Sequence, residues 1–102
     1  MEKEIEFQDE QGKTQTVKLR RLKYGEYSKY EEETVDTKII GGQPIVKVST
    51  SKLKTLGILK SVVKSTVPIN NLADVEKLDR QTGDKLYELF VELNSQNLKK
   101  NE

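Results

Sequence analysis

Hydrophobic and polar side chains alternate in two short segments near the N-terminus. Ile5 and Phe7 are separated and flanked by polar residues, and so are Val17 and Leu19. A period of two is typical of strands with one buried face. The segment DEQGK lies between them and contains the glycine that short hairpin loops favour. The pattern therefore predicts an N-terminal antiparallel hairpin formed by residues 4–7 and 14–19.

Basic, aromatic and acidic side chains are mixed in the next segment, KLRRLKYGEYSKYEEETV. Its spacing predicts a helix that begins near Gly25, with Tyr27 and Tyr30 on one face and the glutamates of residues 31–33 in solvent. Beyond this helix, β-branched residues stand on both sides of GGQP, whose glycines and proline favour a turn. A second hairpin is expected there.

The apolar residues of this second hairpin occur as consecutive pairs, Ile39-Ile40 and Ile45-Val46. Neighbouring residues of a strand point to opposite faces, so consecutive pairs put apolar side chains on both faces. We therefore expect these strands either to be buried on both sides or to be covered by a partner.

The period changes to that of a helix after Ser51, and Pro68 is expected to end this helix. Ser49, Thr50 and Ser51 are candidate N-caps. Gly57 lies inside the helix, where glycine costs about 1 kcal/mol relative to alanine, so it either weakens the prediction or permits close packing.

Two further helices are predicted toward the C-terminus. Asn71 is placed to cap a short helix that runs to Leu78. Residues 83–97 form the clearest helix, because their apolar residues recur at i, i+3, i+4 and i+7. These residues are Leu86, Leu89, Phe90 and Leu93.

The chain has 102 residues, which suits one domain. The predicted fold is a single α+β domain over residues 1–98, with an N-terminal hairpin, a helix, a second hairpin and two or three C-terminal helices. Residues 99–102 are expected to form a frayed tail.

The chain contains no cysteine and no histidine. Zinc sites that use those ligands, thiol nucleophiles and Ser-His or Cys-His pairs are therefore excluded. Carboxylates are the remaining acid or base candidates, but those late in the chain fall on the wet side of predicted helices. Glycine-rich phosphate loops and calcium-binding loops are not found. We expect no catalytic residues, no metal and no cofactor, and hence not an enzyme.

The formal net charge is +1, which argues against a generic nucleic-acid-binding protein. The charge is unevenly distributed, since residues 36–70 carry six basic side chains and one acidic side chain. We expect folding either to pair this segment with its acidic flanks or to present it to an acidic partner. The charged N-terminus and the lack of a long apolar run predict a cytoplasmic protein without a membrane partner.

A basic and aromatic cluster is a candidate polar interface. Its residues are Arg20, Arg21, Tyr24, Tyr27 and Tyr30. We expect one or two of the tyrosines to join the core and the rest to border a protein interface, where tyrosine and arginine are enriched. Alternatively, the cluster could stack on single-stranded nucleic acid. Acidic residues in the same segment oppose binding of phosphate.

The broad apolar arc of residues 53–63 suits a central core helix first, and alternatively a helix that presents an apolar surface to a helical partner. Some of the candidate contacts must belong to the core instead, because the helical period is the same for both. The candidates are Leu53, Leu56, Ile58, Leu59, Val62, Leu86, Phe90 and Leu93.

Two short sequence segments resemble those of a known protein family. Residues Leu19 to Glu26 alternate leucine and basic residues before Tyr-Gly-Glu, and the last predicted helix contains Leu93-Asn94. This layout is similar to the tail assembly chaperones of long-tailed bacteriophages and related prophage proteins. The resemblance implies a non-enzymatic factor that covers the helical, aggregation-prone tape measure protein and delivers it to tail tube subunits.

Two alternatives from other classes remain open. A virion structural or adaptor protein would form homo-oligomers through its sheet edges. A single-stranded nucleic-acid-binding protein would use the basic and aromatic cluster, and its affinity would fall steeply with salt.

Overall fold

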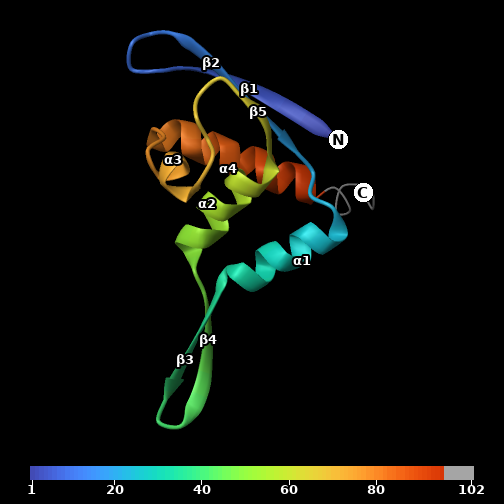
Figure 1. The fold of residues 1–102 in the computed structure, drawn as a ribbon, viewed down its shortest axis with the longest axis vertical. Helices are drawn as coiled ribbons and strands as arrows, with labels where there is room; N and C mark the ends of the chain where they lie inside the picture. The colour runs from blue at the N-terminus through green and yellow to red at the C-terminus, as the bar shows by residue number, and fades with distance from the viewer. Residues whose placement is uncertain (96–102) are drawn as a thin grey trace.

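A computed structural model describes residues 1–95 of the chain. Two antiparallel sheets and four helices make up this part, with the arrangement shown in Figure 1. Their order is β1 (Glu2–Gln8), β2 (Thr14–Arg20), α1 (Tyr24–Glu33), β3 (Val35–Ile40), β4 (Gln43–Val48), α2 (Thr50–Ser61), β5 (Val62–Ser65), α3 (Leu72–Glu76) and α4 (Arg80–Asn94). The predicted α+β class and both predicted hairpins are confirmed.

The first sheet has the strand order β1-β2-β5 and covers one side of the helices. Its central strand alternates as predicted, because Val17 and Leu19 are fully buried while the residues between them point outward. Gly12 takes a positive φ of 77° in the turn between β1 and β2, and it donates to Asp9 O at 2.9 Å. A side chain with a Cβ would be strained there.

The helix predicted after Ser51 was expected to continue toward Pro68, and this prediction is wrong at its end, where the chain forms strand β5. Helix α2 ends at Ser61, whose hydroxyl donates to the carbonyls of Gly57 and Ile58 at 2.9 and 3.1 Å. The chain then pairs antiparallel with β2, opposing Ser65 to Val17. The helical spacing alone would place the β-branched residues after Ser61 in α2. They pair instead with the open edge of β2, where β-branched residues are favoured.

One hydrophobic cluster fills the space between the first sheet and the helices. Gly57 of α2 allows the closest approach, since a Cβ at this position would lie 2.9 Å from Cε2 of Phe90. Of the two alternatives for Gly57, the structure therefore shows close packing. The buried apolar residues are Val17, Leu19, Leu22, Tyr30, Leu56, Ile58, Ile69, Val75, Leu86, Leu89, Phe90 and Leu93.

Two helix caps agree with their sequence signals. Asn71 Oδ1 accepts from Asp74 N at 2.9 Å at the start of α3. Ser49 Oγ accepts from Lys52 N at 3.3 Å at the start of α2, which selects one of the three candidate caps. The predicted tail at 99–102 and the last residues of the predicted helix over 83–97 lie outside the described residues.

The second hairpin extends away from the rest of the molecule, at the bottom of Figure 1. The principal extents are 53, 36 and 21 Å, and the Cα radius of gyration is 15.5 Å. A compact chain of this length has a radius of gyration of about 13 Å. We call residues 35–48 the arm and the remaining described residues the body.

Candidate protein-binding site

The arm is a regular two-residue hairpin. Gly41 and Gly42 have φ values of 61° and 82°, as the two central positions of a type I′ turn require. The turn fixes the register, which runs from Val35 opposite Val48 to Ile40 opposite Gln43. Because the residues facing each other across an antiparallel pair point to the same side, this register also determines the composition of each face.

The register gives the arm two different faces. One side, which we call the apolar face, carries only apolar residues and one threonine: Val35, Thr37, Ile39, Pro44, Val46 and Val48. The other side, which we call the mixed face, carries charged residues near the body and isoleucines near the turn: Asp36, Lys38, Ile40, Gln43, Ile45 and Lys47.

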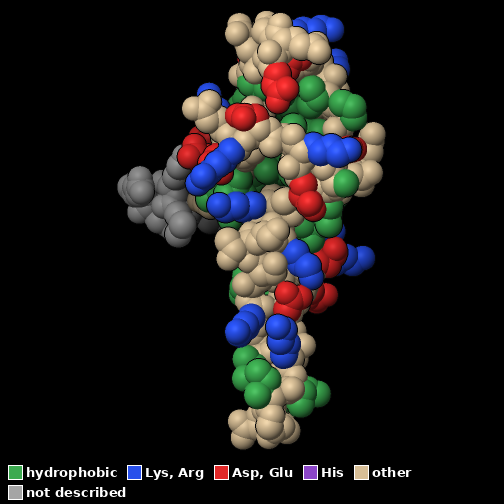
Figure 2. Space-filling view, turned by 90° about the vertical axis from the view of Figure 1, so that its left-hand side faces the viewer, with side chains coloured by type: hydrophobic (Ala, Val, Ile, Leu, Met, Phe, Trp, Pro, Cys, Tyr) green, Lys and Arg blue, Asp and Glu red, His purple; other side chains and the backbone are tan. Residues whose placement is uncertain are grey.

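The apolar side chains of the arm are open to solvent. Ile39 is 77% exposed, Val46 is 63% exposed and Val48 is 57% exposed. Ile40 on the mixed face is 58% exposed. Figure 2 shows hydrophobic side chains gathered toward the free end of the arm, with lysines closer to the body. A contiguous exposed apolar surface of this kind is typical of a protein-interaction site.

The base of the arm is firmly attached to the body. Ser49 N donates to Thr34 O at 2.7 Å, and Thr34 is only 3% exposed. Thr34 Oγ1 in turn donates to Glu31 O at the end of α1, again at 2.7 Å. An ion pair of 3.0 Å joins Asp36 of the arm to Lys52 of α2. These contacts orient the arm, so its apolar surface is presented in a defined direction.

The eight apolar contacts predicted from helical periodicity lie elsewhere. Five are buried in the core, each at most 8% exposed: Leu56, Ile58, Leu86, Phe90 and Leu93. Three are half-buried and pack against that core: Leu53, Leu59 and Val62. A partner cannot reach the five buried side chains in this fold, because they hold the first sheet and the helices together.

The tyrosines of the predicted polar interface are separated by the fold. Tyr30 is 2% exposed and its hydroxyl donates to Leu53 O at 2.6 Å; burial raises the pKa of this hydroxyl. Tyr27 is half-buried and its ring is 5.5 Å from that of Tyr30. Both contact Phe90, with ring centroids 6.5 and 5.1 Å away. Tyr24 is 91% exposed and alone remains available to an external ligand among these three.

The two arginines of that cluster take part in local interactions. Arg20 forms a two-pronged ion pair with Glu26, at 2.8 and 2.7 Å. Glu26 also accepts from Lys23 N at 2.9 Å, at the start of α1. The hydrogen bond from Arg20, followed by that from the Lys23 amide, lowers the pKa of the Glu26 carboxyl to about 2. Arg21 N donates to Met1 O at 2.9 Å and extends the first sheet.

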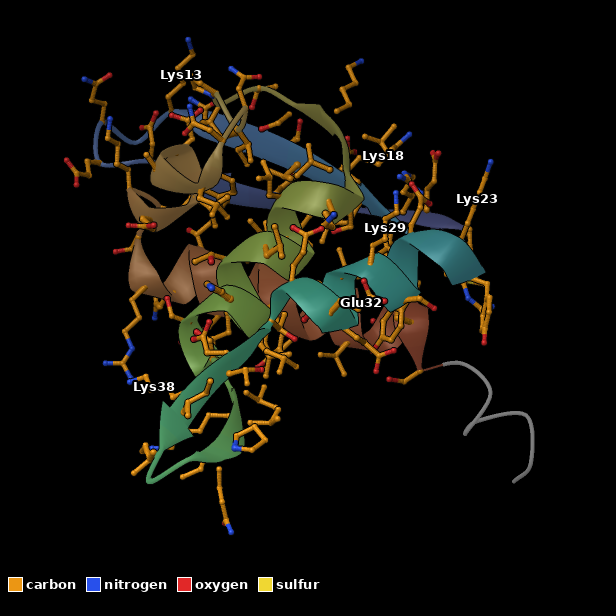
Figure 3. The ribbon with its side chains drawn as sticks, turned by 60° about the horizontal axis from the view of Figure 1, so that its bottom comes forward. Lys13, Lys18, Lys23, Lys29, Glu32 and Lys38 are labelled. Carbon is orange, nitrogen blue, oxygen red and sulfur yellow. The ribbon has the colours of Figure 1, made fainter. Side chains whose placement is uncertain are left out.

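Positive charges are spread over several elements. In Figure 3, Lys13 and Lys18 lie on the first hairpin, Lys23 and Lys29 around α1, and Lys38 on the arm. Binding along a nucleic-acid backbone is favoured by a concentrated basic field, whereas these five lysines lie on three separate parts of the fold.

Part of the basic middle segment is compensated within the chain. Lys60 pairs with Glu33 of the N-terminal flank at 2.9 Å, and Lys52 pairs with Asp36 at 3.0 Å. The ammonium group of Lys54 lies 5.9 Å from the centre of the Tyr87 ring. The other three lysines of this segment are Lys38 and Lys47 on the mixed face of the arm and the exposed Lys64 of β5.

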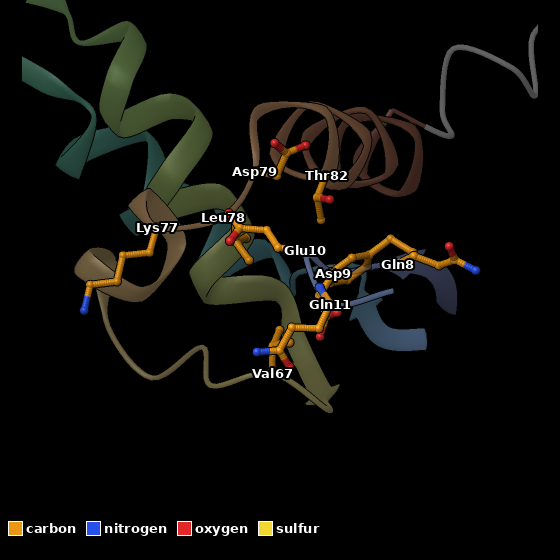
Figure 4. A pocket seen from close by; sticks show the side chains of 10 residues that line it. Gln8, Asp9, Glu10, Gln11, Val67, Lys77, Leu78, Asp79 and Thr82 are labelled. Carbon is orange, nitrogen blue, oxygen red and sulfur yellow. Dashed lines mark hydrogen bonds between the residues drawn. The ribbon is translucent and has the colours of Figure 1, made fainter. Parts of the chain in front are cut away.

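A cleft of about 530 Å³ lies between the β1–β2 loop and the connection from α3 to α4 (Figure 4). Asp9 and Asp79 line this cleft, and their carboxylates accept hydrogen bonds from residues close to them in the chain. Asp9 accepts from Gln11 N, Lys13 N and Gln15 Nε2, each at 2.9 Å, and the Gln15 bond is the main cause of its lowered pKa. Asp79 accepts from Gln81 N at 3.1 Å and caps α4. These bonds shape the backbone around the cleft.

Residues 1–95 contain no group of three or more acidic side chains placed to hold a metal ion. In the same part of the chain, none of the helices combines the length and the apolar character needed to cross a bilayer.

Comparisons of the chain with protein-family models, curated proteins and solved structures find no significant match.

Proposed function

We propose that the protein is a non-enzymatic protein-binding factor whose arm covers the apolar surface of a helical client. The observation that carries this proposal is the apolar face of the arm, where Ile39, Val46 and Val48 are each more than half exposed. Burial of apolar area in a complex contributes about 25 cal/mol for each Å² removed from water, before the cost of association is subtracted. The defined attachment of the arm reduces the ordering cost of binding.

The proposed setting is phage or prophage tail assembly, and the proposed client is a tape measure protein. The family resemblance of Leu19 to Glu26 and Leu93-Asn94 supports this setting. The physical requirements agree with it, because an amphipathic client helix aggregates through its apolar stripe unless that stripe is covered. The charged surface of the body would then keep the complex in solution.

The proposal predicts that a long helical protein is encoded beside this gene, and co-expression with that protein tests it. The wild-type protein should raise the soluble fraction of that neighbour severalfold. Val46→Lys on the arm should abolish the increase, since a lysine in the middle of the apolar face would lose its hydration on binding.

Val63→Lys is the matched control, because Val63 is an exposed valine of a strand in the body, 45% exposed. This variant should retain the effect on solubility. An insoluble client in the presence of the wild-type protein, an equal loss with both variants, or a gene neighbourhood without a long helical protein would each contradict the proposal.

A further inference from the structure

The two outer edges of the arm differ in their free backbone groups. Ser49 and Thr34 form a hydrogen-bonded pair at the base, with an N to O distance of 2.7 Å. Hydrogen-bonded and non-bonded pairs alternate along an antiparallel ladder, so the N–H and C=O groups of Val35, Thr37 and Ile39 point away from β4. Among residues 1–95, no strand pairs with this outer edge of β3.

The outer edge of β4 is interrupted. The same alternation places the outward-facing backbone groups of β4 at Pro44, Val46 and Val48. Proline has no N–H, and proline on an edge strand discourages further pairing. The edge of β3 is therefore the one that can accept another strand.

We infer that the edge of β3 pairs with the same edge of a second copy of this chain, antiparallel and centred on Thr37. This register places Asp36 opposite Lys38 of the second copy, and Lys38 opposite its Asp36. On the other side of the sheet, Val35 faces Ile39 of the second copy. Opposite charges and apolar pairs facing each other both stabilise strand pairing.

The neighbouring registers are disfavoured by charge. A shift in one direction puts Asp36 opposite Asp36 of the second copy, and a shift in the other puts Lys38 opposite its Lys38. Like charges directly opposite each other destabilise a pair of strands. The sequence of β3 is thus complementary to itself in one register.

The result is a closed dimer with a two-fold axis, because Pro44 lies at both outer edges of the four-stranded sheet. The apolar faces of the two arms join into one continuous surface. The contact between two short strands is small, so we expect a dissociation constant in the range of roughly 1–100 µM. This dimer does not depend on the proposed client.

Disulfide cross-linking tests the register directly, since the chain has no cysteine of its own. In the inferred dimer the two Thr37 Cα atoms are about 5.5 Å apart, which is within the range that a disulfide spans. Thr37→Cys should therefore form a covalent dimer under mild oxidation. Val46→Cys is the matched control, because Val46 is the cross-strand neighbour of Thr37 but faces the other edge; it should cross-link far more slowly.

Sedimentation equilibrium of the full chain tests the edge and the charges. Thr37→Pro removes an outward N–H from β3 and should abolish the dimer, while Val46→Pro removes one from β4 and should retain it. Lys38→Asp should weaken dimerisation about tenfold or more, because it puts an acidic side chain opposite Asp36 of the second copy, whereas Lys38→Arg keeps the charge and should retain the dimer. Circular dichroism checks that each variant is folded.

Two results would overturn the inference. One is a wild-type chain that stays monomeric up to the highest soluble concentration. The other is a dimer that cross-links equally through both cysteine variants or that is equally strong in Lys38→Asp and Lys38→Arg. Either outcome leaves the proposed client binding intact, because that rests on the solubility of the client.

Discussion

Ile58 in α2 and Ile39 in β3 are the same side chain in opposite environments. Ile58 is 2% exposed and belongs to the core, whereas Ile39 is 77% exposed on the arm. The body uses its apolar residues to hold a thin domain together, and the arm leaves its apolar residues in water. The comparison separates apolar side chains that stabilise the fold from those that are available to a partner.

The largest expected effect comes from shortening these two isoleucines. Ile58→Ala should lower the free energy of unfolding by about 2–5 kcal/mol, because it leaves a cavity in the core. Ile39→Ala should lower it by roughly 1 kcal/mol at most, since only the preference of an exposed strand changes. Urea denaturation of both variants measures the difference, and equal losses would remove the distinction between arm and body.

The second effect concerns the contact between α2 and α4. Gly57→Ala should destabilise the protein by about 1–2 kcal/mol, because the new Cβ would lie 2.9 Å from the Phe90 ring and overpacking outweighs the gain in helix preference. Gly83→Ala is the control, since nothing lies within 4 Å of a Cβ there. It should stabilise the protein by about 0.5–1 kcal/mol. A stabilising Gly57→Ala would mean that the helices are less closely packed.

A smaller effect is expected at the tyrosines. Tyr30→Phe should lower the free energy of unfolding by about 1 kcal/mol, because it removes the 2.6 Å hydrogen bond to Leu53 O inside the core. Tyr24→Phe should change it very little, since Tyr24 is 91% exposed. The thermal unfolding midpoints of the two variants test this difference. A larger decrease for Tyr24→Phe than for Tyr30→Phe would contradict the placement of Tyr30 in the core.

The smallest effect depends on pH. The hydrogen bond from Arg20, followed by that from the Lys23 amide, lowers the pKa of Glu26 from 4.5 to about 2, so these contacts stabilise the folded state at neutral pH. This contribution should be lost as the pH falls from about 4.5 toward 2. Glu26→Gln should therefore be less stable than the wild type at pH 7, and the difference should shrink in acid. Denaturant midpoints at several pH values give the comparison; a difference that grows in acid would have the wrong sign.

Local sequence signals predicted most elements of the fold. Alternation around Val17 and Leu19 identified the first hairpin, and two glycines identified the turn of the second. Strand β5 was missed because Val62 and Val63 continue the helical spacing of α2. Pairing with β2, more than 40 residues earlier in the chain, decides their conformation, and short-range periodicity contains no information about it.

The burial of single apolar residues was harder to predict than the fold. Core and interface residues of a helix share one period, so the burial of Leu86 and Leu93 could not be read from spacing. The useful signal was the consecutive pairs at residues 39–40 and 45–46, which left burial and a partner as equal alternatives. The strand register supplies the missing information, because it determines which residues of the arm form the apolar face and which form the mixed face.

Hydrogen–deuterium exchange of the dilute protein, alone and with its co-expressed client, tests the central claim most directly. The account predicts fast exchange of the outward-facing arm amides in the free protein and strong protection of residues 35–48 in the complex. The amides of α2 and α4 should change little. Protection confined to the body, with an arm that exchanges as fast as before, would contradict the assignment of the arm as the binding site.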